Sequence, residues 1–306
     1  MLDRGVILNE LKQYLKDIGV RFSENEPMNR HTTFKTGGNA DLMVFPNGKQ
    51  QLSSVLSYCG AEGISPFILG NGSNLLVSDD GIRVPVISVS EGFDELRLLD
   101  ETTVFAGAGT ALIKLCKFAL EHSLSGLEFA YGIPGSVGGA VFMNAGAYGG
   151  EMRDVVDRAE HLTFDGRHGA LNSDSLHFGY RHSAYKEQNC VITGAVFRLR
   201  KEDPEKIKAK MLELLQRRKD KQPLEYPSAG SVFKRPEGYY AGALIEQSGL
   251  KGKRIGGAAV SEKHAGFIVN LGGATTSDVL ALIEICKQTV KEKFGVSLET
   301  EIQMVL

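Results

Sequence analysis

The sequence predicts an α+β fold. Helical segments and short β-forming runs mix through the first two hundred residues, and the strand runs outnumber the helices, which argues against a strict ladder of βαβ units. Apolar residues make up 42% of the 306 residues, enough to bury a sizeable core in two domains. Charge density rises at residues 200–203. We therefore expect a domain at 1–200, with lobes at about 1–65 and 66–200, and a second domain at 201–306.

Apolar residues at three- and four-residue spacing predict the helices. Glycine suits a helix C-terminus, whereas small polar residues and proline suit the N-terminus. Two predicted helices lie at 7–18, with Gly19 as C-cap, and at 52–59. Three more are predicted by where they begin: one after Thr110 as N-cap, one after Asp203 as N-cap with Pro204 as the first helical residue, and one from Thr276.

Short runs rich in β-branched and aromatic residues predict the strands. They lie at 42–45, 67–69, 75–77, 84–89, 104–106, 191–199, 266–271 and 298–306. The last strand alternates apolar and polar residues, which places Glu299 and Glu301 on one face. That face is either solvated or, if another domain covers it, lines a cleft.

Charge, hydropathy and cysteine content exclude several classes of protein. The 35 basic and 37 acidic residues give a net charge of −2, which disfavours a nucleic-acid-coating role. Apolar runs are far shorter than the roughly 20 residues of a membrane helix, and the first residues indicate an amphipathic segment rather than a signal peptide. The 4 cysteines are widely spaced without a CxxC pair, so we expect buried thiols in a reducing cytoplasm and no metal site.

Glycine is concentrated in a few loops. The 36 glycines make up about 12% of the 306 residues, against roughly 7% in an average protein. Eight of them fall between residues 126 and 150. A smaller cluster is Gly70-Asn71-Gly72-Ser73-Asn74, and Ser136 is placed to begin a short helix. Such loops bring backbone N–H groups close to phosphate oxygens. Tight turns explain any one loop, whereas two dense clusters in one domain favour a bound pyrophosphate.

Two common phosphate-binding motifs are missing from these loops. Neither cluster ends in the Lys-Ser/Thr pair of a P-loop. The missing P-loop disfavours a nucleoside triphosphatase. The segments Gly70-x-Gly72 and Gly107-x-Gly109 have Leu75 and Leu112 where a dinucleotide fingerprint has its third glycine, so that motif is missing as well.

Several polar residues have both a catalytic and an ordinary interpretation. The guanidinium of Arg181, in the aromatic segment 178–186, either clamps a carboxylate or packs on a ring at the surface. Ser231 lies on a glycine-flanked loop and is by itself typical of a turn. A basic cluster favours an anionic small molecule such as a nucleotide diphosphate, with a solvated helix end as the alternative. It comprises Lys219, Lys221, Lys234, Arg235, Lys251, Lys253 and Arg254.

Six motifs are distributed along nearly the whole length of the chain. They are Asn29–Gly38, Leu69–Leu76, Gly132–Gly139, Phe178–Ser183, Ala229–Lys234 and Gly256–Ser261. In this order they resemble the UDP-N-acetylenolpyruvoylglucosamine reductases, flavoenzymes of peptidoglycan precursor synthesis. Some members carry an inserted loop whose tyrosine covers the substrate, and the sequence resembles the shorter type without it.

The resemblance implies an FAD-binding domain of the vanillyl-alcohol-oxidase type followed by an α+β substrate domain. It implies non-covalent FAD, because Asn71, Ser73 and Asn74 stand where some relatives of that fold have a flavin-linking histidine. The residues implied in FAD binding are Gly70, Asn71, Gly72, Ser73, Asn74, Leu75, Gly135, Ser136, Gly138, Gly139 and Arg218.

The implied reaction uses NADPH as co-substrate. A hydride passes from NADPH to FAD, and then from flavin N5 to the β-carbon of the enolpyruvyl ether of UDP-N-acetylglucosamine, which becomes UDP-N-acetylmuramate. Arg181 and Glu301 match the family's enolate-stabilising pair, and Ser231 matches the donor that protonates the α-carbon. The matches to substrate-binding positions are Tyr180, Lys221, His264 and Arg235, the last standing where the family has asparagine.

We therefore expect a cytoplasmic oxidoreductase, monomeric or weakly homo-oligomeric, that binds a UDP-sugar and neither nucleic acid nor membrane. Two other classes stay open. A flavin oxidase of the same fold would have a base in place of Ser231 and release peroxide. A non-catalytic nucleotide-binding module would show no turnover that depends on Ser231.

Overall fold

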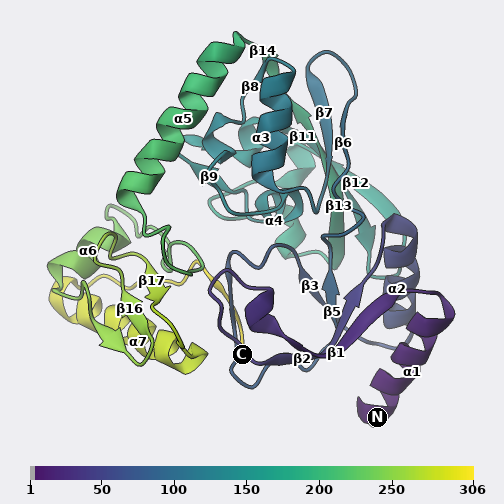
Figure 1. Ribbon diagram of the computed structural model, residues 1–306, viewed down its shortest axis with the longest axis horizontal. Coiled ribbons are helices and arrows are strands. Elements are labelled where there is room, and N and C mark those ends of the chain that lie inside the picture. The colour runs from purple at the N-terminus through teal and green to yellow at the C-terminus, as the bar shows by residue number, and fades with distance from the viewer. Residues whose placement is uncertain (1–3) are drawn as a thin grey trace. The chain divides into compact units, whose positions relative to one another are not determined.

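In the computed structural model, which describes residues 4–306, the chain forms two compact units (Figure 1). Each unit collects segments that are distant in sequence. The first unit contains the chain up to Glu24, Leu42–Asn71 and Val84–Gln216, and the second contains Asn25–Asp41, Gly72–Arg83 and Arg217–Leu306. The assignment of residues 1–200 to the cofactor and 201–306 to the substrate stays a prediction.

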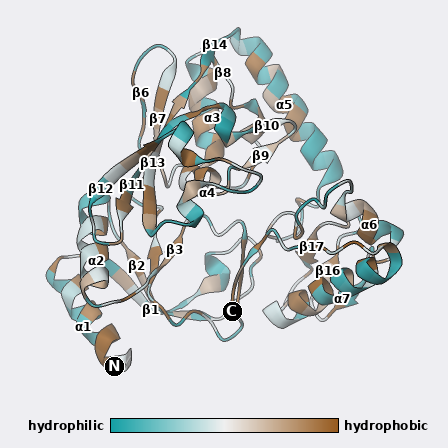
Figure 2. Cartoon of the chain, turned by 180° about the vertical axis from the view of Figure 1, so that it is seen from behind, coloured by the Kyte–Doolittle hydropathy of each residue, from teal (hydrophilic) through white to brown (hydrophobic). Residues whose placement is uncertain are grey.

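A five-stranded antiparallel sheet forms the centre of the first unit. Its strand order is β12 (His168–Asn172), β11 (Val156–Thr163), β13 (Cys190–Arg198), β7 (Thr103–Gly107) and β6 (Leu96–Leu98). Residues 191–197 of β13 are all buried, and Figure 2 shows this strand largely in hydrophobic brown. Helix α4 (Val137–Phe142) packs on β13 and β7. The sheet therefore supports the glycine-rich segment from which α4 begins.

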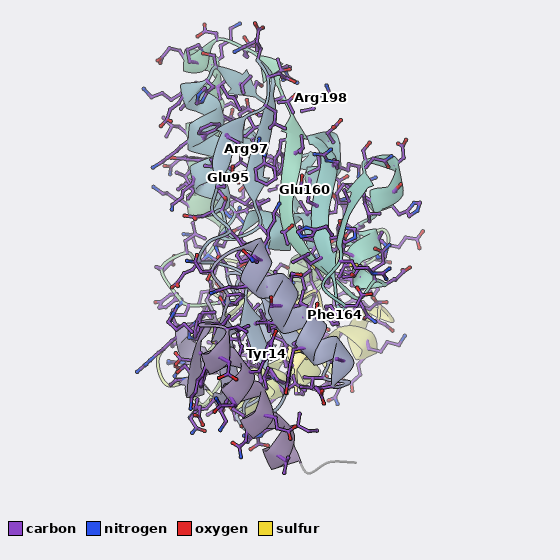
Figure 3. All side chains as sticks on the ribbon, turned by 90° about the vertical axis from the view of Figure 1, so that its right-hand side faces the viewer. Tyr14, Glu95, Arg97, Glu160, Phe164 and Arg198 are labelled. Carbon is purple, nitrogen blue, oxygen red and sulfur yellow. The ribbon has the colours of Figure 1, made fainter. Side chains whose placement is uncertain are left out.

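Charged side chains also project from this sheet. Figure 3 shows Glu95 just before β6, Arg97 of β6, Glu160 of β11 and Arg198 of β13. Glu160 pairs with Lys49 at 2.7 Å and with a neighbouring arginine on its own strand at 3.2 Å. The negative charge of Glu160 is thus balanced by Lys49 and Arg158, which belong to the same unit.

A smaller four-stranded sheet contains two of the points where the chain passes from one unit to the other. Its order is β1 (Arg21–Pro27), β2 (Asn39–Phe45), β5 (Val86–Ser88) and β3 (Phe67–Leu69), with β2 and β3 parallel to β5. Helices α1 (Arg4–Asp17) and α2 (Lys49–Ala61) meet through Tyr14, labelled in Figure 3, and Tyr58, whose rings stack at 4.3 Å. The chain leaves the first unit within β1 and enters it again within β2.

Two further helices, two short strand pairs and five 3₁₀ turns complete this part of the fold. They are α3 (Leu112–Glu121), α5 (Pro204–Lys221), the pairs β8 (Leu124–Ser125) with β14 (Arg200–Lys201) and β9 (Gly146–Ala147) with β10 (Gly150–Glu151), and the 3₁₀ turns η1 (Met28–Arg30), η2 (Glu128–Ala130), η3 (Met152–Asp154), η4 (Asp174–Leu176) and η5 (Ala184–Lys186). Among residues 4–306, no helix combines the length and the apolar character needed to cross a bilayer.

The second unit packs helices on a small antiparallel sheet. The sheet has the order β15 (Arg254–Ile255), β16 (Ala258–Val260) and β17 (Ile268–Asn270). Helix α7 (Thr276–Phe294) lies on β15 and β16 and contacts α6 (Ala241–Gln247) (Figure 1). A separate parallel pair joins β4 (Leu75–Val77) to β18 (Gln303–Val305). The last strand of the chain is therefore completed by a segment from its first third.

The predicted α+β class is confirmed, and most predicted elements occur at their expected places. Strands 67–69 and 75–77 agree with β3 and β4 to the residue. Pro204 begins α5, and the Asp203 carboxylate accepts the Glu205 N–H at 2.9 Å. The first residue of α7 is the predicted Thr276, with Thr275 as N-cap.

Two predictions about local structure are wrong. Thr110 does not cap α3, because its hydroxyl points to the Glu95 carbonyl at 3.5 Å, and Ala111 is the N-cap. The closing strand 298–306 is confined to Gln303–Val305, because its partner β4 is only 3 residues long. Upstream of β18, Thr300 pairs with Phe233 instead.

Candidate active site

The two glycine-rich loops meet in the first unit. Ser136 is the N-cap residue of α4, and the adjacent backbone is fixed because the Leu112 N–H donates to the Gly135 carbonyl at 2.9 Å. A Cβ atom added to Gly70 would lie 2.9 Å from Ser136 Oγ. The predicted loops are thus close enough to bind one ligand together.

Ser136 offers this site an unused hydroxyl. The residue is 2% exposed, and its Oγ has no hydrogen-bond partner among residues 4–306. A buried hydroxyl without a partner costs about 1–3 kcal/mol. An acceptor on a bound molecule, such as a phosphate oxygen of FAD, would satisfy it, so the residues present fit the cofactor.

Not every amide in this loop is available to a ligand. The N–H of Gly138 donates to Ala108 at 2.8 Å, that of Val137 to Thr110 at 2.9 Å, and that of Gly135 to Ile133 at 3.0 Å. Several backbone amides of residues 135–139 are therefore engaged within the protein and cannot all donate to one phosphate group. The Ser136 hydroxyl is the clearest donor that this loop leaves for a ligand.

The continuation of the first glycine loop belongs to the second unit. Gly72 has φ +58°, and an added Cβ would overlap the His31 carbonyl oxygen, so only glycine fits. The Asn74 side chain donates to the Glu301 carbonyl at 3.2 Å, and the Asn74 carbonyl accepts the Gln303 N–H at 2.9 Å. The predicted cofactor loop is thereby tied to the predicted catalytic segment at the end of the chain. Ser73 is half-buried beside them and Leu75 begins β4.

Arg181 occupies a tight turn of the first unit. Gly179 and His182 exchange backbone hydrogen bonds of 3.0 and 3.2 Å, so Tyr180 and Arg181 form the tip of the turn. Arg181 has φ +54°, a left-handed conformation that is unfavourable for residues with a Cβ. Its guanidinium lies over the Tyr180 ring at 5.1 Å and approaches the Gly146 carbonyl at 3.5 Å. The tyrosine ring is largely exposed.

Ser231 and Glu301 come together in the second unit. The Glu301 N–H donates to the Val232 carbonyl at 2.8 Å, and the Val232 N–H donates to the Gly266 carbonyl at 2.9 Å. Ser231 therefore lies beside both the end of the chain and the loop before β17. Its hydroxyl donates to the Phe233 carbonyl at 3.2 Å.

His264 is the titratable side chain next to Ser231. A Cβ added to Gly266 would lie 2.9 Å from His264 Cε1 and 3.5 Å from Ser231 Oγ, so the imidazole and the hydroxyl flank the same glycine. Gly242 closes the other side of the ring, 3.0 Å from Cε1 by the same measure. Nδ1 accepts the Gly266 N–H at 3.1 Å, which places the proton of the neutral ring on Nε2. Burial lowers the pKa of His264, in agreement with a neutral ring.

The two candidate carboxylates differ in environment. Glu299 is 74% exposed in its side chain and pairs with Lys234 at 3.0 Å. Glu301 is half-buried and its backbone joins the Ser231 segment. Of the two, Glu301 is the better placed for chemistry beside Ser231.

The remaining predicted binding residues lie around the second unit. Arg218 Nε donates to Gln222 at 2.8 Å, Lys221 is exposed as the last residue of α5, and Arg235 stacks on Tyr240 at 4.1 Å. Arg181 and Tyr180 belong to the first unit, whereas Ser231 and Glu301 belong to the second.

Other features do not coincide with the predicted site residues. A hollow of about 290 Å³ in the first unit is lined by strand residues that include His161 and Thr193, and none of the predicted site residues lines it.

Across residues 4–306, no three His, Cys, Asp or Glu side chains are grouped to hold a metal ion. Burial raises the pKa of the Cys59 and Cys286 thiols to about 12.

Comparison with known proteins agrees with this geometry. Residues 222–305 match the C-terminal domain of UDP-N-acetylenolpyruvoylglucosamine reductase, and residues 40–171 match an FAD binding domain. The chain is 50% identical to the UDP-N-acetylenolpyruvoylglucosamine reductase of Caldanaerobacter subterraneus over 98% of each chain. It is 49% identical to that of Listeria welshimeri over 97% of this chain and 99% of the relative. The crystal structure of the Thermus caldophilus enzyme superposes with a TM-score of 0.80 at 37% identity, covering 94% of this chain and 99% of that one.

The FAD-binding domain and the glycine loops that meet at Ser136 define an FAD-binding oxidoreductase. Within that class, the chain belongs to the UDP-N-acetylenolpyruvoylglucosamine reductase family. The family indicated by the six sequence motifs is confirmed, as is a fold with an FAD-binding domain followed by a distinct C-terminal domain. The roles of individual residues stay predictions.

Proposed function

We propose that the protein reduces the enolpyruvyl ether of UDP-N-acetylglucosamine to UDP-N-acetylmuramate with NADPH, in peptidoglycan precursor synthesis. The observation that carries the proposal is the pairing of the Ser231 and Glu301 segments, whose backbones join at 2.8 Å between the Glu301 N–H and the Val232 carbonyl. This pairing places the segments that carry the Ser231 hydroxyl and the Glu301 carboxyl group side by side. Protonation of a carbon atom beside a developing negative charge requires groups of these two kinds. The family to which the chain belongs supports the choice of substrate.

FAD, held by the loops Gly70–Leu75 and Gly135–Gly139, would supply the redox chemistry for transfer of a hydride from NADPH to the substrate β-carbon. Hydride addition converts the carbon–carbon double bond to an enolate whose charge lies largely on the carboxylate. Arg181 holds that carboxylate through charge-assisted hydrogen bonds. Glu301 is the second residue proposed to stabilise the enolate.

Ser231 completes the reaction. Its hydroxyl proton passes to the α-carbon, the enolate collapses to the carboxylate, and Ser231 regains a proton from water. The product has gained one hydride and one proton, so the atoms and electrons balance. Tyr180, Lys221, Arg235 and His264 are proposed to bind the UDP-sugar.

For the cofactor, we assign the pyrophosphate to the loops Gly70–Leu75 and Gly135–Gly139, with Arg218 on the flavin side. The unsatisfied Ser136 hydroxyl supports this assignment. Three backbone amides of the second loop already donate within the protein. The Ser136 hydroxyl therefore contributes a larger share of pyrophosphate binding than it would if all the amides of the loop were available.

The decisive experiment separates the two halves of the reaction in a Ser231→Ala variant. Under anaerobic conditions NADPH should bleach the flavin absorbance at the wild-type rate, because Ser231 takes no part in that step. Reoxidation by the enolpyruvyl sugar nucleotide should slow by about 100-fold or more, in the range of general-acid catalysis. Ser277→Ala, a serine of the same unit whose hydroxyl donates to Asp79, is the matched control and should behave as wild type.

The possible outcomes distinguish the competing classes. Unchanged reoxidation in Ser231→Ala removes Ser231 as the proton donor. If the enolpyruvyl substrate cannot reoxidise the reduced flavin of the wild-type protein, the substrate assignment is wrong. Rapid reoxidation by oxygen with release of peroxide would indicate an oxidase instead.

A further inference from the structure

The Arg181 turn has a conformation that its own sequence does not favour. Seven non-glycine residues of the described chain have positive φ, and four of them lie between residues 144 and 181. Such strained backbone persists only where surrounding contacts fix it. The contacts around Arg181 therefore bear directly on where its guanidinium points.

Asn144 supplies the first of these contacts. The residue is fully buried, and its Nδ2 donates to the Gly179 carbonyl at 2.9 Å and to the Glu151 carboxylate at 2.7 Å. Its Oδ1 accepts the Arg153 N–H at 2.9 Å. Both amide hydrogens and the amide oxygen of Asn144 are thus engaged, and one hydrogen fixes the residue at which the turn begins.

Ser183 supplies the contact on the other side of the turn. It is also fully buried, and its Oγ donates to the Phe142 carbonyl at 2.7 Å. Between the two, the Arg181 guanidinium approaches the Gly146 carbonyl. Residues 142–146 therefore contact the turn before, at and after Arg181.

We propose that Asn144 and Ser183 are positioning residues that hold the Arg181 turn in the conformation that receives the substrate carboxylate. The inference rests on the proposed role of Arg181. A two-pronged guanidinium–carboxylate contact is sensitive to displacement of the backbone that carries it. Loss of the Asn144 donor leaves the Gly179 carbonyl without this partner and frees the turn to relax from its left-handed conformation.

The test compares two ligands that differ in the lactyl carboxylate, using the FAD-loaded protein. Calorimetry measures the affinity for UDP-N-acetylmuramate, which has this group, and for UDP-N-acetylglucosamine, which lacks it. Asn144→Gly accepts φ +43° without strain and removes the side chain. We expect it to weaken binding of the first ligand about 10-fold, as loss of a charge-assisted contact does, and to change binding of the second by less than about twofold.

Coupling to Arg181 is measured by a double-mutant cycle. Arg181→Ala should show the same ligand selectivity, and Asn144→Gly combined with Arg181→Ala should bind no more weakly than Arg181→Ala alone. Ser183→Ala, which removes one hydrogen bond, should give a smaller loss with the same selectivity. It also serves as the test if Asn144→Gly does not fold.

A core variant separates positioning from general destabilisation. Leu162→Ala removes a fully buried side chain of the same unit and should leave the affinities for both ligands unchanged at temperatures below unfolding. Equal weakening of both ligands in Asn144→Gly, or additive losses in the cycle, overturns the inference. If Arg181→Ala itself binds both ligands as wild type does, the proposed role of Arg181 fails, and the positioning role fails with it.

Discussion

The two segments that bear the proposed catalytic groups are held in different ways. The Arg181 turn of the first unit is fixed by buried side chains, with the Asn144 amide and the Ser183 hydroxyl on either side of it. The Ser231 loop of the second unit is fixed by main chain, through Val232 to Gly266 and to Glu301. One segment is supported by particular side chains, and the other by backbone pairing.

This difference predicts which substitutions each segment tolerates. Backbone pairing does not depend on the identity of neighbouring side chains, so the Ser231 loop should tolerate exchanges of its exposed neighbours. It is sensitive where the backbone approaches closely, which is at glycines. The Arg181 turn should show the opposite pattern, because removal of one buried polar group, Asn144 or Ser183, takes away part of its support.

The largest expected effect in the backbone-held segment is that of Gly266→Val. Its Cβ would lie 2.9 Å from the His264 ring, and the added methyl groups would crowd the space toward Ser231 Oγ. A displacement of about 1 Å in a catalytic group costs on the order of 100-fold in rate, so reoxidation of the reduced flavin by substrate should fall by that factor.

Stopped-flow absorbance measures this step, with NADPH reduction as the internal control. The smaller substitution Gly266→Ala, introduced in a His264→Ala background, should add little to the loss caused by His264→Ala alone, because the clashing ring is gone. If Gly266→Val reacts at the wild-type rate, the close packing around His264 does not constrain Ser231.

An intermediate effect is expected for the pH dependence of stability. Burial lowers the pKa of His264 in the second unit and of His161 in the first below the ordinary value of 6.5. The unfolded chain therefore binds more protons than the folded one just below pH 6.5, and the free energy of unfolding falls as the pH decreases through that range.

Replacing either histidine with glutamine should make the unfolding temperature less dependent on pH between neutrality and about pH 5. Calorimetry of His264→Gln and His161→Gln compares the acid sensitivity of the two units. A wild-type unfolding temperature that rises on acidification through this range would contradict the assignment of neutral buried rings.

The smallest effect is expected for Glu299→Gln. Its carboxylate is exposed and pairs with Lys234 at the surface, and such ion pairs contribute about 0–1 kcal/mol. Steady-state turnover and unfolding temperature should stay close to wild type, while Glu301→Gln slows the substrate half-reaction. Similar losses in both variants would show that exposed neighbours of the backbone-held segment do matter.

Local patterns were sufficient to predict most elements of the fold. Apolar runs bounded by Pro66 and Gly70 and by Asn74 and Ser78 predict the bounds of β3 and β4, and the Asp203-Pro204 pair marks the start of α5. The predictions failed where the outcome depends on a distant partner. The length of the last strand is set by β4, and the hydroxyl of Thr110 is drawn to the Glu95 carbonyl rather than to its own helix.

The site was predictable as a set of residues but not as an arrangement. Six motifs identify Arg181, Ser231 and Glu301 through their resemblance to a family, but no spacing in the sequence indicates that Val232 pairs with both Gly266 and Glu301. Asn144 was overlooked because it stands in a glycine-rich run, and burial of its amide is visible only in three dimensions. A polar residue between apolar and small neighbours in Met143-Asn144-Ala145 is the signal that was available.

The pairing of β4 with β18 has a consequence for synthesis of the chain on the ribosome. Leu75 emerges more than two hundred residues before Gln303, its partner in the parallel pair. At roughly 5–20 residues per second, the edge of β4 waits about 10–45 s for the strand that covers it. Throughout that interval the nascent protein presents an uncovered apolar strand, and the second unit is completed only when β18 leaves the exit tunnel. Termination of synthesis before Gln303 should therefore favour aggregation over release of a nearly native protein.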